Sequence, residues 1–327
     1  MVENSKVKEM FRKLNEKLVN FSDIESADML SGLSPKYWVK CNNKDYLFKY
    51  SNVYSDYTDF GEVFTSYLSY ILGFNCVKAV FSKDLFKKDN DEVRGVLIES
   101  YRTKNVKESI SLNSLRKKYY KEEFGYTPNE VMTMCRKFCN DRNLVLDSNM
   151  EQNLKDMALM DYLLLQTDRH AGNIEFLIEE KDNIKTLKLA PMFDNAYCLY
   201  LFKSVSEATA IYRYISRKEC DITYNSNKNP MVNFYIKQDD TENDVEPEKI
   251  VVRDLACELL KNKKLMGLYK NFLKLDFKKE VDFIRSIYKK KLPEIHYNLI
   301  LKGVENRVKA LNAELVKQMN EKEIEIF

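Results

Sequence analysis

The segment QTDRHAGNIEFL, residues 166–177, gathers side chains capable of acid–base or metal chemistry into one short turn. Asp168, His170 and Asn173 follow an apolar helical pattern and precede an alternation typical of a strand. A carboxylate can take a proton from a hydroxyl, and an amide carbonyl oxygen can bind a hard cation. The same residues could instead form a polar turn in which Asp and Asn hydrogen-bond their own backbone. The rest of the sequence decides between the two interpretations.

The spacing of Asp168 and Asn173, D-x-x-x-x-N, is that of a kinase catalytic loop. In such a loop the aspartate accepts the proton of the attacking hydroxyl, and the asparagine binds Mg²⁺. Asp194, just after an expected strand hairpin with its turn at residues 179–183, would supply a carboxylate to the cation that neutralises the phosphates. The motif alone arises often by chance. The order of helix, motif, hairpin and second acid favours the catalytic interpretation.

A lysine and a glutamate far upstream could complete such a site. Lys49 lies in YLFKY, an expected strand, and Glu62 follows on an expected helix. Kinases hold the nucleotide phosphates with a lysine that a helix glutamate keeps in place. Alternatively, Lys49 is an ordinary exposed strand residue, and Asp59 caps the helix with Glu62 three residues on. Taken with the downstream residues, an ion pair between Lys49 and Glu62 is the favoured account.

His170 is one of two histidines, and it could act in several ways. A hydrolase base would need a nucleophile elbow such as G-x-S-x-G, and a metal ligand would need a second nearby His or Cys. The sequence contains neither, so we expect the His170 imidazole to brace the loop by hydrogen bonds. His296, on a late helix, is expected to be structural.

The composition is that of an ordinary globular protein. The 327 residues are 44% hydrophobic and 31% charged, and a net charge of +3 gives no indication of nucleic-acid or membrane binding. No signal peptide or span of about 18 apolar residues is evident. Seven scattered cysteines without C-x-x-C predict free thiols in a reducing compartment rather than a zinc site. We expect a cytoplasmic protein, with translocation as an effector left open.

The pattern of elements predicts an α+β protein with a small N-terminal lobe, residues 1–104, and a larger, mainly helical lobe, residues 105–327. An amphipathic helix within residues 1–25 is followed by two short strands around a turn at residues 42–45, and then by a helix and two more strands. The helix around Glu62 should end at Gly73. Residues 221–249, rich in Asn, Asp, Lys and Glu, are expected to form a surface loop.

The segments QTDRHAGNIEFL and KLAPMFDNA resemble the bacterial HipA-like serine/threonine kinase family, particularly its compact, CtkA-type members. That family carries a T-D-x-H-x-x-N catalytic loop and a later L-x-P-x-[YF]-D metal motif. YLFKY is similar to its nucleotide-lysine strand, and GEVFTSYLSYILGF to its glutamate helix. The DRHAGNI core is also similar to that of phosphatidylinositol kinases, whose fold is distantly related. The resemblance spans about residues 30–200.

This resemblance implies a two-lobed protein-kinase-like fold with ATP and Mg²⁺ as cofactors. It implies that Asp168 is the catalytic base in a loop shared with His170, and that Asn173 and Asp194 bind Mg²⁺. Lys49 and Glu62 would hold the nucleotide phosphates. The remaining expected nucleotide contacts are the hinge residues Glu99 and Tyr101, and Ser31 and Ser34 in a phosphate-covering loop near residues 29–38 that lacks G-x-G-x-x-G.

The favoured function is transfer of the γ-phosphate of ATP to Ser or Thr of a protein, and to the chain itself. Two alternatives stay open: a lipid or small-molecule kinase, because the DRHAGN core is shared, and a catalytically silent nucleotide-binding module. The expected partner is a protein substrate, without direct nucleic-acid binding. An antitoxin partner stays open but is disfavoured, because the chain is too short to contain in full the N-terminal partner region of HipA.

Overall fold

The computed structural model of the protein describes most of the chain. The described residues are 4–17, 36–41, 44–50, 57–82, 86–88, 91–93, 95–119, 128–217, 247–288 and 290–324. Ser31 and Ser34 lie outside them, as do residues 29–35 of the expected phosphate-covering loop and residues 221–246 of the expected surface loop. In the part of the chain that is described, no helix is both long and apolar enough to span a membrane.

The chain forms two compact units whose segments alternate along the sequence. The first comprises Met1–Thr103, Pro191–Thr209 and Leu275–Leu299, and the second comprises Lys104–Ala190, Ala210–Lys274 and Ile300–Phe327. The expected division at residue 104 follows chain order alone, and it stays a prediction. Helices α6 (Val205–Arg217) and α11 (Glu294–Ile324) each contribute residues to both units.

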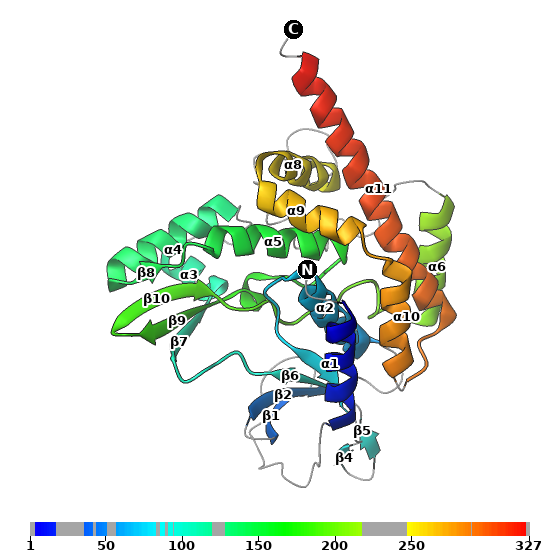
Figure 1. Ribbon diagram of the computed structural model, residues 1–327, viewed down its shortest axis with the longest axis horizontal. Helices are drawn as coiled ribbons and strands as arrows, with labels where there is room; N and C mark the ends of the chain where they lie inside the picture. Colours follow the sequence, from blue (N-terminus) through cyan, green and yellow to red (C-terminus); the bar gives the residue numbers. More distant parts are fainter. Residues whose placement is uncertain are drawn as a thin grey trace. The chain divides into compact units, whose positions relative to one another are not determined.

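An antiparallel sheet forms the strand part of the first unit (Figure 1). Its strands, in spatial order, are β1 (Lys36–Cys41), β2 (Lys44–Tyr50), β6 (Gly95–Glu99) and β3 (Ala79–Phe81). A separate two-stranded ribbon consists of β4 (Phe86–Lys88) and β5 (Asp91–Val93). The predicted pair of strands around a turn at residues 42–45 is confirmed as β1 and β2, although Lys44 and Asp45 belong to β2 and not to the turn.

Helix α2 (Thr58–Leu72) packs on this sheet and is almost entirely buried. It ends at Gly73, whose left-handed conformation (φ 74°) lets its N–H reach the carbonyl of Ser69, so the predicted C-cap is confirmed. The alternative in which Asp59 caps the other end is wrong, because the helix begins at Thr58 and its N-cap is Tyr57, two residues before Asp59. Asp59 lies in the first turn, where its carboxylate accepts hydrogen bonds from the N–H of Phe60 and from Tyr288 Oη.

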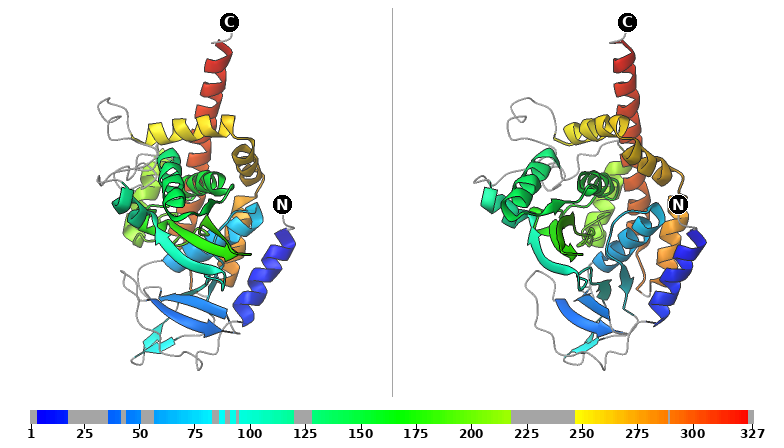
Figure 2. Two further views of the ribbon diagram at one scale, coloured as in Figure 1. Left: turned by 90° about the vertical axis from the view of Figure 1, so that its left-hand side faces the viewer. Right: turned by 60° about the vertical axis from the view of Figure 1, so that its left-hand side comes forward.

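Two further helices of the first unit, α1 (Asn4–Lys17) and α10 (Phe277–Ile287), flank α2 (Figure 2). The buried ring of Phe11 in α1 meets the edge of the Tyr67 ring at a centroid distance of 5.4 Å. Glu280 in α10 accepts a hydrogen bond from Tyr67 Oη and forms an ion pair with Lys8 Nζ of α1 at 3.0 Å. Tyr67 therefore connects α2 to both neighbouring helices.

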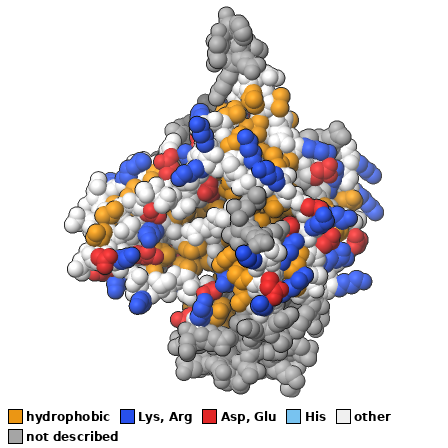
Figure 3. Space-filling model, in the orientation of Figure 1, with side chains coloured by type: hydrophobic (Ala, Val, Ile, Leu, Met, Phe, Trp, Pro, Cys, Tyr) orange, Lys and Arg blue, Asp and Glu red, His pale blue; other side chains and the backbone are white. Residues whose placement is uncertain are grey.

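The second unit is built on a sheet with the strand order β7 (Val106–Ser111), β9 (Glu175–Lys181), β10 (Ile184–Leu189) and β8 (Val145–Leu146). Helices accompany it along the chain: α3 (Leu112–Tyr119), α4 (Pro128–Arg142), α5 (Met150–Leu163), α8 (Pro247–Lys261) and α9 (Lys263–Leu273) (Figure 1). Figure 3 shows Lys, Arg, Asp and Glu side chains interspersed over the visible face, in keeping with the small net charge.

The predicted hairpin after the polar turn is present as β9 and β10, with a tighter turn than the sequence suggested. Lys181 pairs with Ile184, so only Asp182 and Asn183 form the turn, instead of the expected residues 179–183. Both have positive φ, 52° and 63°. Asp and Asn tolerate this conformation, which matches the twist of a two-residue hairpin.

Phe176, fully buried in β9, tests how strongly this sheet depends on its apolar face. We expect Phe176→Ala to lower the free energy of unfolding by about 3–5 kcal/mol, because it removes a ring and leaves a cavity. Urea unfolding followed by circular dichroism measures the change. Val145→Ala, at a position 55% exposed in β8, is the control and should stay within about 0.5 kcal/mol of the wild type. Equal losses in the two variants would contradict this account.

Candidate active site

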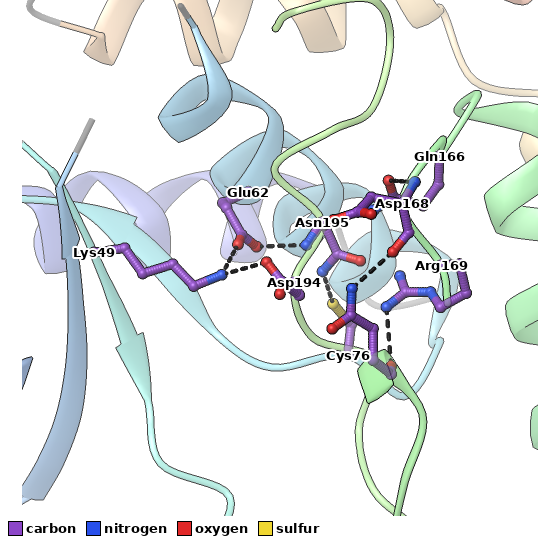
Figure 4. A network of polar contacts seen from close by, with 9 residues as sticks. Lys49, Glu62, Cys76, Gln166, Asp168, Arg169, Asp194 and Asn195 are labelled. Atoms are coloured by element: carbon purple, nitrogen blue, oxygen red, sulfur yellow. Dashed lines mark hydrogen bonds and ion pairs between the residues drawn. The ribbon is translucent and has the colours of Figure 1, made fainter. Parts of the chain in front are cut away.

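Lys49 of strand β2 points toward two carboxylates in the first unit (Figure 4). Its Nζ lies 2.6 Å from Oε1 of Glu62 on α2 and 2.7 Å from Oδ1 of Asp194. The Lys49 and Glu62 side chains are 9% and 1% exposed, whereas Asp194 is 20% exposed. The structure thus brings together three of the residues singled out in the sequence, and Asp194 is the acid that solvent can reach.

The charge of Lys49 depends on these partners. Burial alone would lower the pKa of Lys49, but the Glu62 and Asp194 carboxylates outweigh it and raise that pKa above its ordinary value. Lys49 is therefore a permanent cation at neutral pH. A buried cation held by two anions is suited to bind the oxygens of a phosphate chain.

Asn195 completes the surroundings of Glu62, a role that sequence reasoning did not predict. Its backbone N–H donates to Glu62 Oε2 at 3.0 Å, so both oxygens of the carboxylate have a donor. The Asn195 side chain, 1% exposed, donates from Nδ2 to Cys76 Sγ at 3.6 Å. These contacts orient the glutamate from the side opposite Lys49 (Figure 4).

The backbone after Asp194 adopts an unusual conformation. Asp194, Leu199 and Tyr200 have positive φ values of 57°, 53° and 60°. An aspartate tolerates this region, but leucine and tyrosine rarely adopt it, at a cost of about 1–3 kcal/mol each. Leu199 and Tyr200 are buried, so packing of their side chains offsets this cost.

The predicted catalytic loop lies in the second unit, where backbone hydrogen bonds shape it. The Asp168 carbonyl accepts from the backbone N–H of His170 at 2.9 Å and from Asn173 Nδ2 at 2.7 Å. The backbone N–H of Asp168 donates to Gln166 Oε1 at 3.1 Å. Just before the loop, the buried Leu165 has a φ of 46°, a strained conformation that marks the abrupt end of the preceding helix.

The amide of Asn173 has a defined orientation. A backbone carbonyl can only accept, so the atom that faces the Asp168 carbonyl must be the NH₂ group of Asn173. The side-chain carbonyl oxygen Oδ1 consequently points away from that bond. Asn173 is 7% exposed, and an oriented amide oxygen of this kind is a suitable ligand for a hard cation.

A buried ion pair between Arg169 and Asp161 holds the predicted catalytic loop in place. Arg169 donates from Nε to Asp161 Oδ2 at 3.0 Å and from Nη2 to Oδ1 at 3.2 Å, a bidentate geometry. Its Nη1 donates to the Asn173 backbone carbonyl at 3.3 Å. Burial raises the pKa of Asp161, and the guanidinium of Arg169 opposes that shift. Arg169 thus joins helix α5 to both ends of the predicted catalytic loop.

His170 is exposed, and it braces the short turn Ala171–Asn173. Its Nδ1 accepts a hydrogen bond from the Gly172 N–H at 3.0 Å. His170 is therefore in contact with the loop backbone, and its membership of the catalytic group stays a prediction.

The predicted hinge residues lie at the end of β6. Glu99 forms ion pairs with Lys44 and with Lys78, the latter at 3.5 Å; burial alone would raise the pKa of Glu99, but the two lysines lower it. The ring of Tyr101 stacks on Phe193 at a centroid distance of 5.8 Å. Contacts of these residues with a nucleotide stay a prediction.

No model of a protein family matches the sequence, and none of the curated proteins matches it. Among solved structures, the fold is similar to that of the proinflammatory kinase CtkA of Helicobacter pylori. The two align with a TM-score of 0.59 and 17% identity over 92% of this chain and 97% of that chain. HipA of Shewanella oneidensis, solved with HipB and operator DNA, aligns with a TM-score of 0.46 and 12% identity over 94% of this chain and 70% of that chain.

At such low identity, the comparison with CtkA shows the fold alone. It confirms the predicted kinase-like α+β fold, with a small part rich in strands and a larger, mainly helical part. The TM-score of the HipA alignment is too low to support an argument. The roles of individual residues therefore depend on the geometry described above.

Arg169→Met should expose the cost of burying Asp161 without its partner. We expect a loss of about 3–5 kcal/mol in the free energy of unfolding at pH 7, because an uncompensated carboxylate remains inside. Burial raises the pKa of Asp161, so the folded variant binds a proton at a pH where the unfolded chain has lost it. Its stability should therefore rise as the pH falls from neutral toward about 4.

Urea unfolding at several pH values measures this effect. In the double variant Asp161→Asn, Arg169→Met the pH-dependent recovery should disappear, because no buried carboxyl is left to titrate. A recovery of the same size in both variants would show that another group is responsible.

Proposed function

We propose that the protein is an ATP- and Mg²⁺-dependent kinase that transfers the γ-phosphate to Ser or Thr of a protein, including itself. The observation that carries the proposal is the buried Lys49 ammonium between Glu62 and Asp194. One carboxylate would be enough to neutralise Lys49 in a purely structural ion pair. Here a second carboxylate, that of Asp194, also contacts the ammonium and is partly open to solvent. A cation beside an accessible acid suits a phosphate chain together with a metal ion.

The residues present fit a nucleotide with magnesium. Asp194 offers an accessible carboxylate, and Asn173 offers an oriented amide oxygen, both of which are ligand types that Mg²⁺ prefers. Glu62 is too deeply buried to serve as a ligand, and it keeps Lys49 in place. When bound, the metal neutralises phosphate charge; Lys49 holds phosphate oxygens and draws charge from them.

Asp168 is the proposed base for the acceptor hydroxyl. Its side chain is half-buried, and its backbone is held on both sides by hydrogen bonds to Gln166, His170 and Asn173. A carboxylate on so constrained a backbone can accept the proton of a serine or threonine hydroxyl as the oxygen attacks the phosphorus. The choice of a protein acceptor rests on the resemblance of the loop to HipA-like kinases.

Incubation with labelled ATP and Mg²⁺ tests the proposal, with label on the chain and on added protein as the readout. Asp168→Asn should reduce transfer by about 10²–10⁴-fold, because it removes the base while preserving shape. Asp194→Asn should raise the Mg²⁺ concentration needed for half-maximal activity. Asp182→Asn, in the exposed hairpin turn, is the matched control and should leave transfer unchanged.

The same assay separates the alternatives. Label that appears on lipid vesicles or small alcohols, and not on protein, would change the acceptor class. Stabilisation of the protein by ATP without any transfer would identify a silent nucleotide-binding module. Full transfer by Asp168→Asn would refute the assignment of the base.

A further inference from the structure

The segment of residues 192–201, here the 192–201 segment, is joined to both ends of helix α2 within the first unit. Past the end of the helix, the Met192 N–H donates to the Asn75 carbonyl at 2.9 Å, and the Val77 N–H donates to the Met192 carbonyl at 3.0 Å. Just before the helix, the Tyr57 N–H donates to the Leu201 carbonyl at 2.9 Å. The segment that carries Asp194 therefore runs the length of α2.

Between these ends, the segment approaches the helix at Gly61. A Cβ atom there would lie 2.9 Å from Cys198 Sγ, 3.0 Å from the Ala196 carbonyl oxygen and 3.3 Å from that of Asn195. Two of the three neighbours are backbone atoms, which cannot turn aside as a flexible side chain can. Glycine in a helix interior costs about 1 kcal/mol relative to alanine. The close approach of the 192–201 segment explains why a glycine occupies this position despite that cost.

Polar contacts flank the glycine. Its neighbour Glu62 accepts from the Asn195 N–H at 3.0 Å. One turn further on, Thr65 Oγ1 lies 3.6 Å from Cys198 Sγ, a buried contact. The 192–201 segment thus meets α2 through backbone packing at Gly61 and through the carboxylate that also binds Lys49.

We propose that Gly61 is a positioning residue: its missing side chain lets the 192–201 segment dock on α2, so that Glu62 and Asp194 hold Lys49 as one rigid element. The two carboxylates come from segments far apart in the sequence, and their common docking surface keeps them at one ammonium. The consequence for phosphate transfer rests on the proposed function. The geometry itself can be measured without any turnover.

The test is the rate at which an amine-acylating reagent modifies Lys49, measured by mass spectrometry on the full chain without nucleotide. In Gly61→Ala, displacement of the segment should break the ion pairs that enclose the Lys49 ammonium and admit the reagent, so acylation of Lys49 should be faster than in the wild type. A role limited to stability would lower the melting temperature and leave the acylation rate of the folded protein unchanged.

Gly267→Ala is the matched control, because a Cβ at Gly267 in α9 has nothing within 4 Å. It should leave Lys49 acylation at the wild-type rate. A Gly61→Ala protein that melts cooperatively and also reacts at the wild-type rate would overturn the proposal.

Hydrogen exchange of the wild type covers the case in which Gly61→Ala does not fold. The Asn195 amide, bound to Glu62, should exchange with the same protection as the central amides of α2, since the two open together. Exchange of the Asn195 amide more than about 100-fold faster than those of α2 would show that the segment detaches alone, and would overturn the proposal.

Phosphate transfer is measured in parallel, so that the two proposals can fail separately. In an active wild type, Gly61→Ala should lower kcat at least in proportion to the loss of ion pairing, with the KM for the acceptor unchanged. Faster Lys49 acylation in Gly61→Ala, combined with a wild type that transfers no phosphate, would support the positioning role and refute the proposed function.

Discussion

The buried ammonium of Lys49 is the constraint on which the candidate site depends. A cation removed from water is strongly destabilising unless anions surround it at short distance. Glu62 and Asp194 provide this compensation at 2.6 and 2.7 Å, from a helix and from a segment that begins after a distant hairpin. Strand β2, helix α2 and the 192–201 segment must therefore be assembled together before the lysine is accommodated, and each determines where the other two lie.

In the second unit, too, buried charges of opposite sign compensate each other, beside the predicted catalytic loop. Asp161 and Arg169 are both buried, and the guanidinium also binds the Asn173 carbonyl. Buried ion pairs contribute little net stability relative to well-packed apolar residues, yet losing one partner is costly. Such pairs define geometry more than they add stability. Here they hold the loop backbone around Asp168 and Asn173, where side chains need a constrained orientation.

The sequence predicted much of the local structure and less of the contacts. The strands on either side of residues 42–43 and the helix end at Gly73 followed from alternation and from the left-handed preference of glycine. The prediction of Asp59 as the N-cap was wrong, because a capping pattern of Asp and Glu does not reveal that the cap lies two residues earlier, at Tyr57. The sequence analysis assigned no role to Asn195. Its contact with Glu62 is made by a backbone N–H, which nearly every residue type possesses.

By itself, the sequence determined the order of the elements and the residue types available for chemistry, because periodicity, capping and motif spacing are local properties of the chain. The sequence also favoured the ion pair between Lys49 and Glu62, which the structure contains. Only the tertiary structure decided that Asp194, 145 residues from Lys49, binds the same ammonium. It alone revealed that the backbone of residues 195–196 lies too close to position 61 for any side chain larger than that of glycine. Such contacts depend on how distant segments pack against one another. Hydrophobic pattern and motif spacing are local, so they do not predict this packing.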